Sequence, residues 1–134
     1  MAYGYPNYGS PHIPDYASAK ELHDSIKPIR GRAEECRPIG ARRNTHLTIW
    51  ENQEGDILCR LYQTDCVIFK PNGDIHVTHG GWRTTTTASF IGEVLGQRTS
   101  ISNNGLWLHL PTGSVELCGK GERVSVLRNE GNLS

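Results

Sequence analysis

Residues 64–83, TDCVIFKPNGDIHVTHGGWR, constrain the fold of this chain more than any other stretch. Apolar and polar residues alternate on both sides of Pro71-Asn72-Gly73, as they do in β-strands that bury one face. An Asn-Gly pair meets the positive-φ requirement of a type I′ turn. We therefore predict a β-hairpin, a sharp turn at Gly80-Gly81, and a core that Trp82 plugs between sheet and helix.

Alternating runs on both sides of the hairpin predict more strands. Strands over 46–51, 56–62, 66–70 and 74–79 are expected to form an antiparallel meander. Runs at 99–102, 106–110 and 114–117 predict a second small sheet, and 123–127 predicts a last edge strand. Asn103-Asn104-Gly105 and Pro111-Thr112-Gly113 mark the turns between the later strands.

Two helices complete the pattern. The first is predicted over 16–26, capped by Asp15 or Ser18 and ended by Lys27-Pro28. The second follows four threonines that supply N-caps, and Gly96 is a natural residue to end it. Its apolar stripe is Ala88, Ile91, Val94 and Leu95. The fold class is therefore α+β: mostly an antiparallel β meander, with one short N-terminal helix and one helix packed on the sheet.

At 134 residues the chain is long enough for one domain with its own core. We divide it into an extended Tyr/Pro/Gly arm over 1–14, a short helix and basic connector over 15–43, a β-rich core domain over 44–128, and a frayed C-terminus over 129–134. No apolar run approaches the roughly 20 residues of a membrane span. The N-terminus has neither the basic nor the apolar part of a signal peptide. The expectation is a soluble, intracellular protein.

The charges balance, with 14 basic and 14 acidic residues, so the overall charge favours neither a nucleic-acid binder nor an acidic mimic. Zero net charge instead favours association with a partner or with a second copy. Residues 27–43 carry a local surplus, six basic against two acidic side chains. Arginine binds phosphate in a bidentate manner, and the basic residues are Lys27, Arg30, Arg32, Arg37, Arg42 and Arg43. The alternative is a connector that pairs with its own Glu34 and Glu35.

The arm offers a second candidate contact. Tyr3, Tyr5 and Tyr8 stand among glycines and prolines that disfavour a helix or strand. Tyrosine gives a large contact area for a small loss of entropy, so these side chains are candidates for docking into a groove on a neighbour. A disordered tail is the alternative.

Sites of reaction are poorly supported by the sequence. Cys66 with His76 or His79 could form a nucleophile–base pair, but no feature near Cys66 indicates a lowered pKa. His76 and His79 point to opposite faces of a strand, so they cannot easily share one metal. A disulfide between Cys59 and Cys66 is sterically conceivable but needs an oxidising compartment. We therefore predict reduced, packed cysteines, no catalytic residue, no metal and no cofactor. Gly80-Gly81 before a helix could bind an anion, although no nucleotide-loop motif is present.

The run CRLYQTDCVIFKPNGDIHVTHGGWRTTTT resembles a group of small bacteriophage-encoded proteins of unassigned function. Their pattern is a T-D-x-V strand, a P-[DN]-G turn, a strand ending in G-W-R/N-T, and a helix. LWLHLPTGSVEL is similar to a second tryptophan hairpin in that group, and KPIRGR with CRPIGARR is similar to the lead-in of one branch. The resemblance implies a phage origin and no particular activity.

These observations predict a non-enzymatic bacteriophage accessory protein in the host cell cytoplasm or the virion. It would bind a host or phage macromolecule, protein or nucleic acid, through the arginine-rich segment, without contacting a membrane. The alternative is a virion structural component anchored by the tyrosine arm. A third hypothesis is a small enzyme with a Cys/His site.

Overall fold

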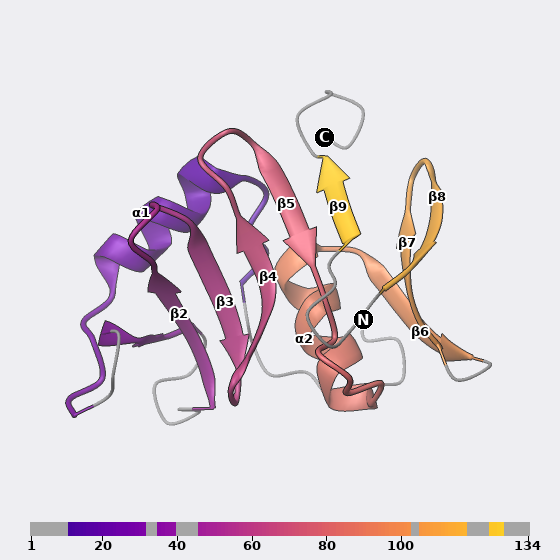
Figure 1. Ribbon diagram of the computed structural model, residues 1–134, viewed down its shortest axis with the longest axis horizontal. Coiled ribbons are helices and arrows are strands. Elements are labelled where there is room, and N and C mark those ends of the chain that lie inside the picture. Colours follow the sequence, from indigo (N-terminus) through magenta and orange to yellow (C-terminus); the bar gives the residue numbers. More distant parts are fainter. Residues whose placement is uncertain (1–10, 32–34, 40–45, 103–104, 118–123, 128–134) are drawn as a thin grey trace.

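The computed structural model describes residues 11–31, 35–39, 46–102 and 105–117, and the backbone of 124–127. Two antiparallel sheets and two helices make up this part of the chain (Figure 1). The predicted α+β class is therefore confirmed. Among the described residues, no helix is both long and apolar enough to span a membrane.

The larger sheet has six strands in the order β1-β2-β3-β4-β5-β9, and every neighbouring pair is antiparallel. Strands β2 to β5 form the predicted meander, and β9 pairs with β5 as the expected edge strand. The strands are β1 (Arg37–Pro38), β2 (Leu47–Glu51), β3 (Ile57–Leu61), β4 (Thr64–Phe69), β5 (Asp74–Val77) and β9 (Val124–Leu127).

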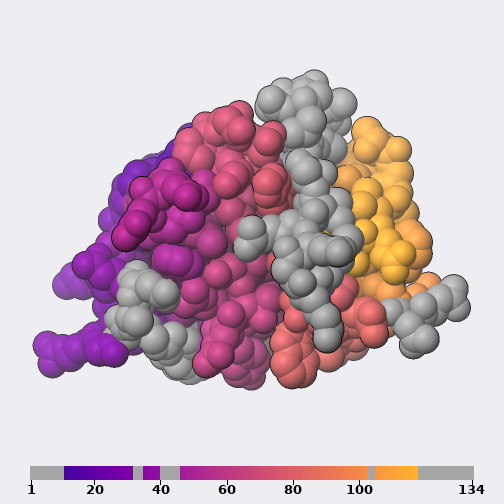
Figure 2. All heavy atoms as spheres, in the orientation of Figure 1, coloured from indigo at the N-terminus to yellow at the C-terminus, as the bar shows by residue number. Residues whose placement is uncertain are grey.

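The smaller sheet has the order β6-β7-β8 and matches the three strands predicted for the last third of the chain. Its strands are β6 (Arg98–Ser102), β7 (Gly105–Leu110) and β8 (Gly113–Glu116). Helix α1 (Tyr16–Ser25) packs on β2 and β3, whereas α2 (Thr85–Leu95) contacts both β4 and β6. Helix α2 therefore joins the two sheets, and Figure 2 shows its residues between the magenta and orange parts of the molecule.

Side-chain caps set where both helices begin. The Asp15 carboxylate accepts a hydrogen bond from Ser18 N at 2.8 Å, so Asp15 rather than Ser18 is the N-cap of α1. Thr84 caps α2 by accepting from Thr87 N at 3.3 Å. Helix α2 ends at Gly96, which takes the left-handed conformation with φ 67° as predicted.

The hairpin turn at 71–73 differs from the prediction. Gly73 N donates to Lys70 O at 2.9 Å, and among the described non-glycine residues only Glu35 and Tyr62 have positive φ, so Asn72 does not. A type I′ turn needs positive φ at both central residues, so that prediction is wrong. Proline fixes φ near −65°, which suits the second position of a type I turn. Gly73, with φ 102°, then supplies the bulge residue of a three-residue loop.

The core lies among one face of the larger sheet, the two helices and the smaller sheet, which contributes the fully buried Leu106 and Leu108. The predicted stripe of α2 is buried, and Phe90 joins it with no exposed area. Trp82 does not plug this core, because its side chain is 62% exposed. Phe69 and Phe90 are instead the large aromatic side chains buried in the core. Gly80 and Gly81 have φ of 63° and 97°, and they turn the chain just before Trp82. The predicted position of Trp82 is therefore wrong, although the sharp turn at the two glycines is confirmed.

Candidate functional site

The main candidate site is a hollow of about 730 Å³ between the β3–β4 turn and the start of α2. We call it the aromatic pocket. Its described lining residues are Leu61, Tyr62, Gln63, Thr64, Trp82, Thr84, Thr86 and Thr87. Three separate stretches of chain therefore build it: one hairpin turn, one loop and the first turn of a helix.

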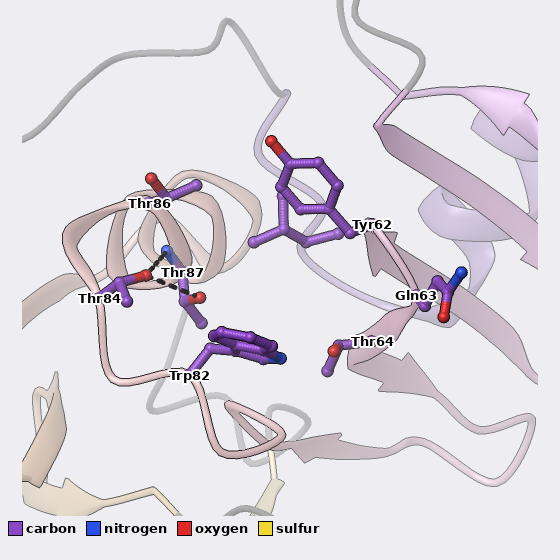
Figure 3. A pocket seen from close by; sticks show the side chains of 8 residues that line it. Tyr62, Gln63, Thr64, Trp82, Thr84, Thr86 and Thr87 are labelled. Carbon is purple, nitrogen blue, oxygen red and sulfur yellow. Dashed lines mark hydrogen bonds between the residues drawn. The ribbon is translucent and has the colours of Figure 1, made fainter.

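Two aromatic rings form opposite sides of the aromatic pocket. Tyr62 is 65% exposed and Trp82 is 62% exposed, and they are the large hydrophobic side chains that the described surface exposes. Figure 3 shows Tyr62 on one side of the opening and Trp82 on the other, with the threonines of α2 beside them. Two exposed rings that line one hollow are a common feature of binding surfaces, because aromatic side chains bury much area with few rotatable bonds.

Tyr62 is held at the rim by an unusual backbone conformation. It begins the two-residue connection between β3 and β4 with a left-handed φ of 56°. Its N–H donates to His46 O at 2.7 Å, and the His46 and Tyr62 rings lie 5.0 Å apart between centroids. A non-glycine residue in this conformation costs about 1–2 kcal/mol. Such strain is concentrated at functional sites, and it supports a binding role for this turn.

The loop that carries Trp82 is held by hydrogen bonds from both glycines. Gly80 N donates to Thr78 Oγ1 at 3.1 Å, and Gly81 N donates to His79 Nδ1 at 3.0 Å. Trp82 N in turn donates to His79 O at 2.9 Å. Burial of His79, with a contribution from the positive charge of Arg83, lowers the pKa of its imidazole. A neutral imidazole keeps Nδ1 as an acceptor, so His79 can hold the loop at neutral pH.

The described lining of the aromatic pocket is mostly apolar and carries no charged side chain. Its described lining residues include no carboxylate, imidazole, thiol or amine. Thr84 and Thr87 are hydrogen bonded through their hydroxyls at 3.3 Å, and both stand at the start of α2. Hydroxyl groups donate and accept hydrogen bonds, whereas acid–base catalysis needs a group that titrates near neutral pH. The pocket is therefore suited to binding a neutral group rather than to reacting with one.

The proposed Cys/His pair gains no support from its surroundings. Burial, together with the charge of Asp65, raises the pKa of the Cys66 thiol to about 12. A thiol must ionise to act as a nucleophile, so Cys66 is inert at neutral pH. Cys36, Cys59 and Cys66 are all free and buried, as predicted for reduced, packed cysteines, and Cys118 lies outside the described residues. The conceivable Cys59–Cys66 disulfide is not formed.

The structure describes only part of the arginine-rich segment. Arg37 packs against the end of α1, where its guanidinium donates to His23 O, and it lies 3.9 Å from the Glu35 carboxylate. Lys27 and Arg30 are exposed. Arg32, Arg42 and Arg43, and the arm residues Tyr3, Tyr5 and Tyr8, lie outside the described residues.

A cluster that the sequence did not reveal joins α1 to β2. Ligand-type atoms of His23, Asp24 and Glu51 lie within 4.8 Å of one another. Lys20 Nζ is 2.9 Å from a Glu51 oxygen and 3.4 Å from an Asp24 oxygen, while Arg37 is 3.3 Å from His23 Nδ1. Two cations already compensate these groups, which makes an ion-pair network a better description than a metal site.

Two further polar clusters lie on the sheets and are satisfied internally. Asp65 accepts hydrogen bonds from Trp50 Nε1 at 2.8 Å and from Arg60 Nε at 2.9 Å, and the Arg60 guanidinium lies 4.6 Å from the centre of the Trp50 ring. On the smaller sheet, His109 lies 2.7 Å from both the Ser100 and Ser114 hydroxyls.

Sequence reasoning placed the candidate contacts elsewhere and missed Tyr62, Gln63 and the pocket-lining threonines. The sequence carried no clear signal for Tyr62, because it continues the alternating run of β3, and only the structure places it in the two-residue connection to β4. Comparison with known proteins adds no assignment, because no protein-family model, curated protein or solved structure matches the chain. The aromatic pocket is therefore interpreted from its own chemistry.

Proposed function

We propose that this protein is a non-enzymatic binding module that holds an extended, uncharged peptide segment of a partner protein in the aromatic pocket. The observation that carries this proposal is the pair of exposed rings, Tyr62 and Trp82, on opposite sides of one hollow. The strained backbone of Tyr62 supports this proposal, because a non-glycine residue with positive φ lowers stability and such residues are concentrated at functional sites.

The chemistry of the lining favours a peptide. Segments rich in proline bind to grooves lined by aromatic rings, which contact the flat faces of the proline rings. The Thr84 hydroxyl donates its proton to Thr87 Oγ1, and its oxygen can accept a hydrogen bond from an amide N–H of such a segment. A sugar would need several planar polar side chains, but the described lining holds one amide, Gln63, and Figure 3 shows it pointing away from the two rings.

The expected affinity is modest. Covering about 100 Å² on each ring, with a matching area on the ligand, buries about 400 Å² in all and gives roughly 10 kcal/mol at 25 cal/mol per Å². Association itself costs at least about 4 kcal/mol. The remainder corresponds to a dissociation constant of about 10–100 µM, which is typical of modules that bind short peptides reversibly.

The resemblance to phage proteins adds the proposal that the partner is a phage or host protein. The arginine-rich segment stays a second candidate surface, since Lys27 and Arg30 are both exposed in its described part. An acidic or phosphate-bearing partner would use that surface, whereas an uncharged segment would use the aromatic pocket.

The test is a titration of isotope-labelled full-length protein, followed by NMR. The probe is an acetylated, amidated peptide of three Pro-Tyr-Pro units, and the matched peptide carries serine in place of each tyrosine and proline. We expect the probe alone to shift the backbone amides of Tyr62 and Thr86 and the indole signal of Trp82. Trp82→Ala should weaken binding at least about tenfold, because it removes half of the aromatic surface.

Arg83→Ala is the matched control, since Arg83 is exposed next to Trp82 but does not line the pocket. This variant should bind the probe as the unchanged protein does. Equal binding by the Trp82→Ala variant would refute the proposal. Shifts at the pocket with a neutral oligosaccharide, and none with the peptide, would replace it with carbohydrate binding.

A further inference from the structure

The contacts of residues 11–13 determine where the N-terminal arm leaves the described structure. Ile13 is buried, and its N–H donates to Val94 O at 2.8 Å. The His12 ring lies against Gly96, since a Cβ added there would be 2.7 Å from His12 Nε2. These contacts hold the chain at the C-terminal end of α2, and residues 1–10 precede this point.

The aromatic pocket is at the opposite end of the same helix. Helix α2 has 11 residues, so its two ends are about 15 Å apart at 1.5 Å per residue. A ten-residue segment spans about 31 Å in the polyproline conformation and about 17 Å as a flexible coil. Residues 1–10 can therefore reach the pocket of their own chain. A tether whose coil length matches the span gives an effective concentration in the millimolar range.

The composition of residues 1–10 matches the pocket as well as the length does. The sequence MAYGYPNYGS has no charged side chain and contains Tyr3, Tyr5, Pro6 and Tyr8. The described pocket lining also lacks formal charge and presents two aromatic rings. A segment without charged side chains loses less hydration on entering an uncharged pocket than the arginine-rich segment, which would have to desolvate its guanidinium groups.

We infer that residues 1–10 bind in the aromatic pocket of the same chain and compete there with the partner peptide. The inference rests on the proposed function, because it assumes that the pocket accepts an uncharged, tyrosine- and proline-containing peptide. The arm holds one proline, Pro6, so we expect it to bind more weakly than a proline-rich partner, at a few hundred micromolar. At a millimolar effective concentration it then reduces the apparent affinity for a partner about three- to tenfold. Displacement of the arm is then part of partner binding.

The experiment compares the full-length chain with a full-length variant carrying Tyr3→Ser, Tyr5→Ser and Tyr8→Ser. The probe is the same Pro-Tyr-Pro peptide. We expect the variant to bind the probe about three- to tenfold more tightly. The matched control, Asn7→Ser, keeps all three tyrosines and should bind as the unchanged chain does. Before any peptide is added, the amide signals of Thr86 and Thr87 should already differ between the variant and the unchanged chain.

The outcomes separate the two proposals. Equal probe binding by both chains would overturn the inference and leave the proposed function standing. Failure of both chains to bind the probe would remove the proposed function and the inference with it. Light scattering over a range of protein concentrations tests whether the arm acts within one chain. A dimer that the tyrosine variant loses would overturn the inference in favour of exchange between copies.

Discussion

Gly80→Ala is the substitution whose effect the structure specifies most closely. Gly80 has φ +63°, and a Cβ placed on it would lie 2.4 Å from Thr64 Cγ2. Real atoms do not approach so closely, so the Thr64 side chain, the loop or β4 must shift. The substitution therefore tests how the loop that presents Trp82 packs against the strand that carries Thr64.

Two free-energy costs determine how much Gly80→Ala destabilises the fold. Alanine in a left-handed conformation costs about 1–2 kcal/mol, and overpacking a tight site costs about 1–3 kcal/mol. We expect Gly80→Ala to lower the free energy of unfolding by about 2–5 kcal/mol. Gly31→Ala is the matched control: φ is +79° there as well, but the added Cβ meets no described atom within 4 Å. Gly31→Ala should cost only the roughly 1–2 kcal/mol of the left-handed conformation.

The assay is urea denaturation of the single and double variants. Thr64→Ser removes the Cγ2 atom and leaves Oγ1 at 3.2 Å from the added Cβ. In the Gly80→Ala background, Thr64→Ser should restore most of the unfolding free energy that is lost through overpacking. The coupling free energy between the two substitutions should therefore be about 1–3 kcal/mol. The cost of placing alanine in a left-handed backbone conformation should remain in the double variant. Gly80→Ala should also weaken probe binding, because Thr64 lines the aromatic pocket.

A loss for Gly80→Ala no larger than for Gly31→Ala would refute the close packing of the loop on β4. The close packing would also be refuted if Thr64→Ser restored no unfolding free energy in the Gly80→Ala background. Either result would mean that the loop carrying Trp82 is free to move away from the strand, and the ordered presentation of the ring would have to be abandoned.

Three further predictions concern the supports of the fold. Because burial lowers the pKa of His79, the unfolded chain takes up that proton first. Stability should therefore be constant above about pH 6.5 and fall below it, and His79→Gln should reduce this fall in urea midpoints measured between about pH 5 and 8. Asp65→Asn leaves the part-buried guanidinium of Arg60 without its carboxylate and should cost about 1–3 kcal/mol in urea denaturation. Glu35→Gln, which changes an exposed carboxylate 3.9 Å from Arg37, should cost less than about 0.5 kcal/mol. Thr84→Ala removes the N-cap of α2 and should lower the unfolding free energy by about 0.5–2 kcal/mol in thermal or urea unfolding, with a serine variant close to the unchanged protein.

Local patterns predicted most of the elements, because a strand or a cap depends on neighbours in the chain. The alternation in 46–77 predicted the meander, and Gly96 marked the end of α2. The predicted type of the turn at 71–73 is wrong because Asn72-Gly73 are not its central residues: Pro71, whose ring fixes its own φ near −65°, and Asn72 are. Even there the hairpin itself was correctly placed, since all these turns reverse the chain.

Local sequence patterns were enough to predict every described strand except β1, the residues at which both helices end, and the sharp turn at Gly80-Gly81. That Phe90 is buried in the core while Trp82 is exposed outside it follows from the packing of elements far apart in the chain. Burial depends on which distant elements meet, and periodicity along one segment carries no information about the space left by another. The aromatic pocket likewise depends on contacts between distant elements. Tyr62, Trp82 and Thr86 belong to a turn, a loop and a helix that become neighbours only when α2 packs on β4.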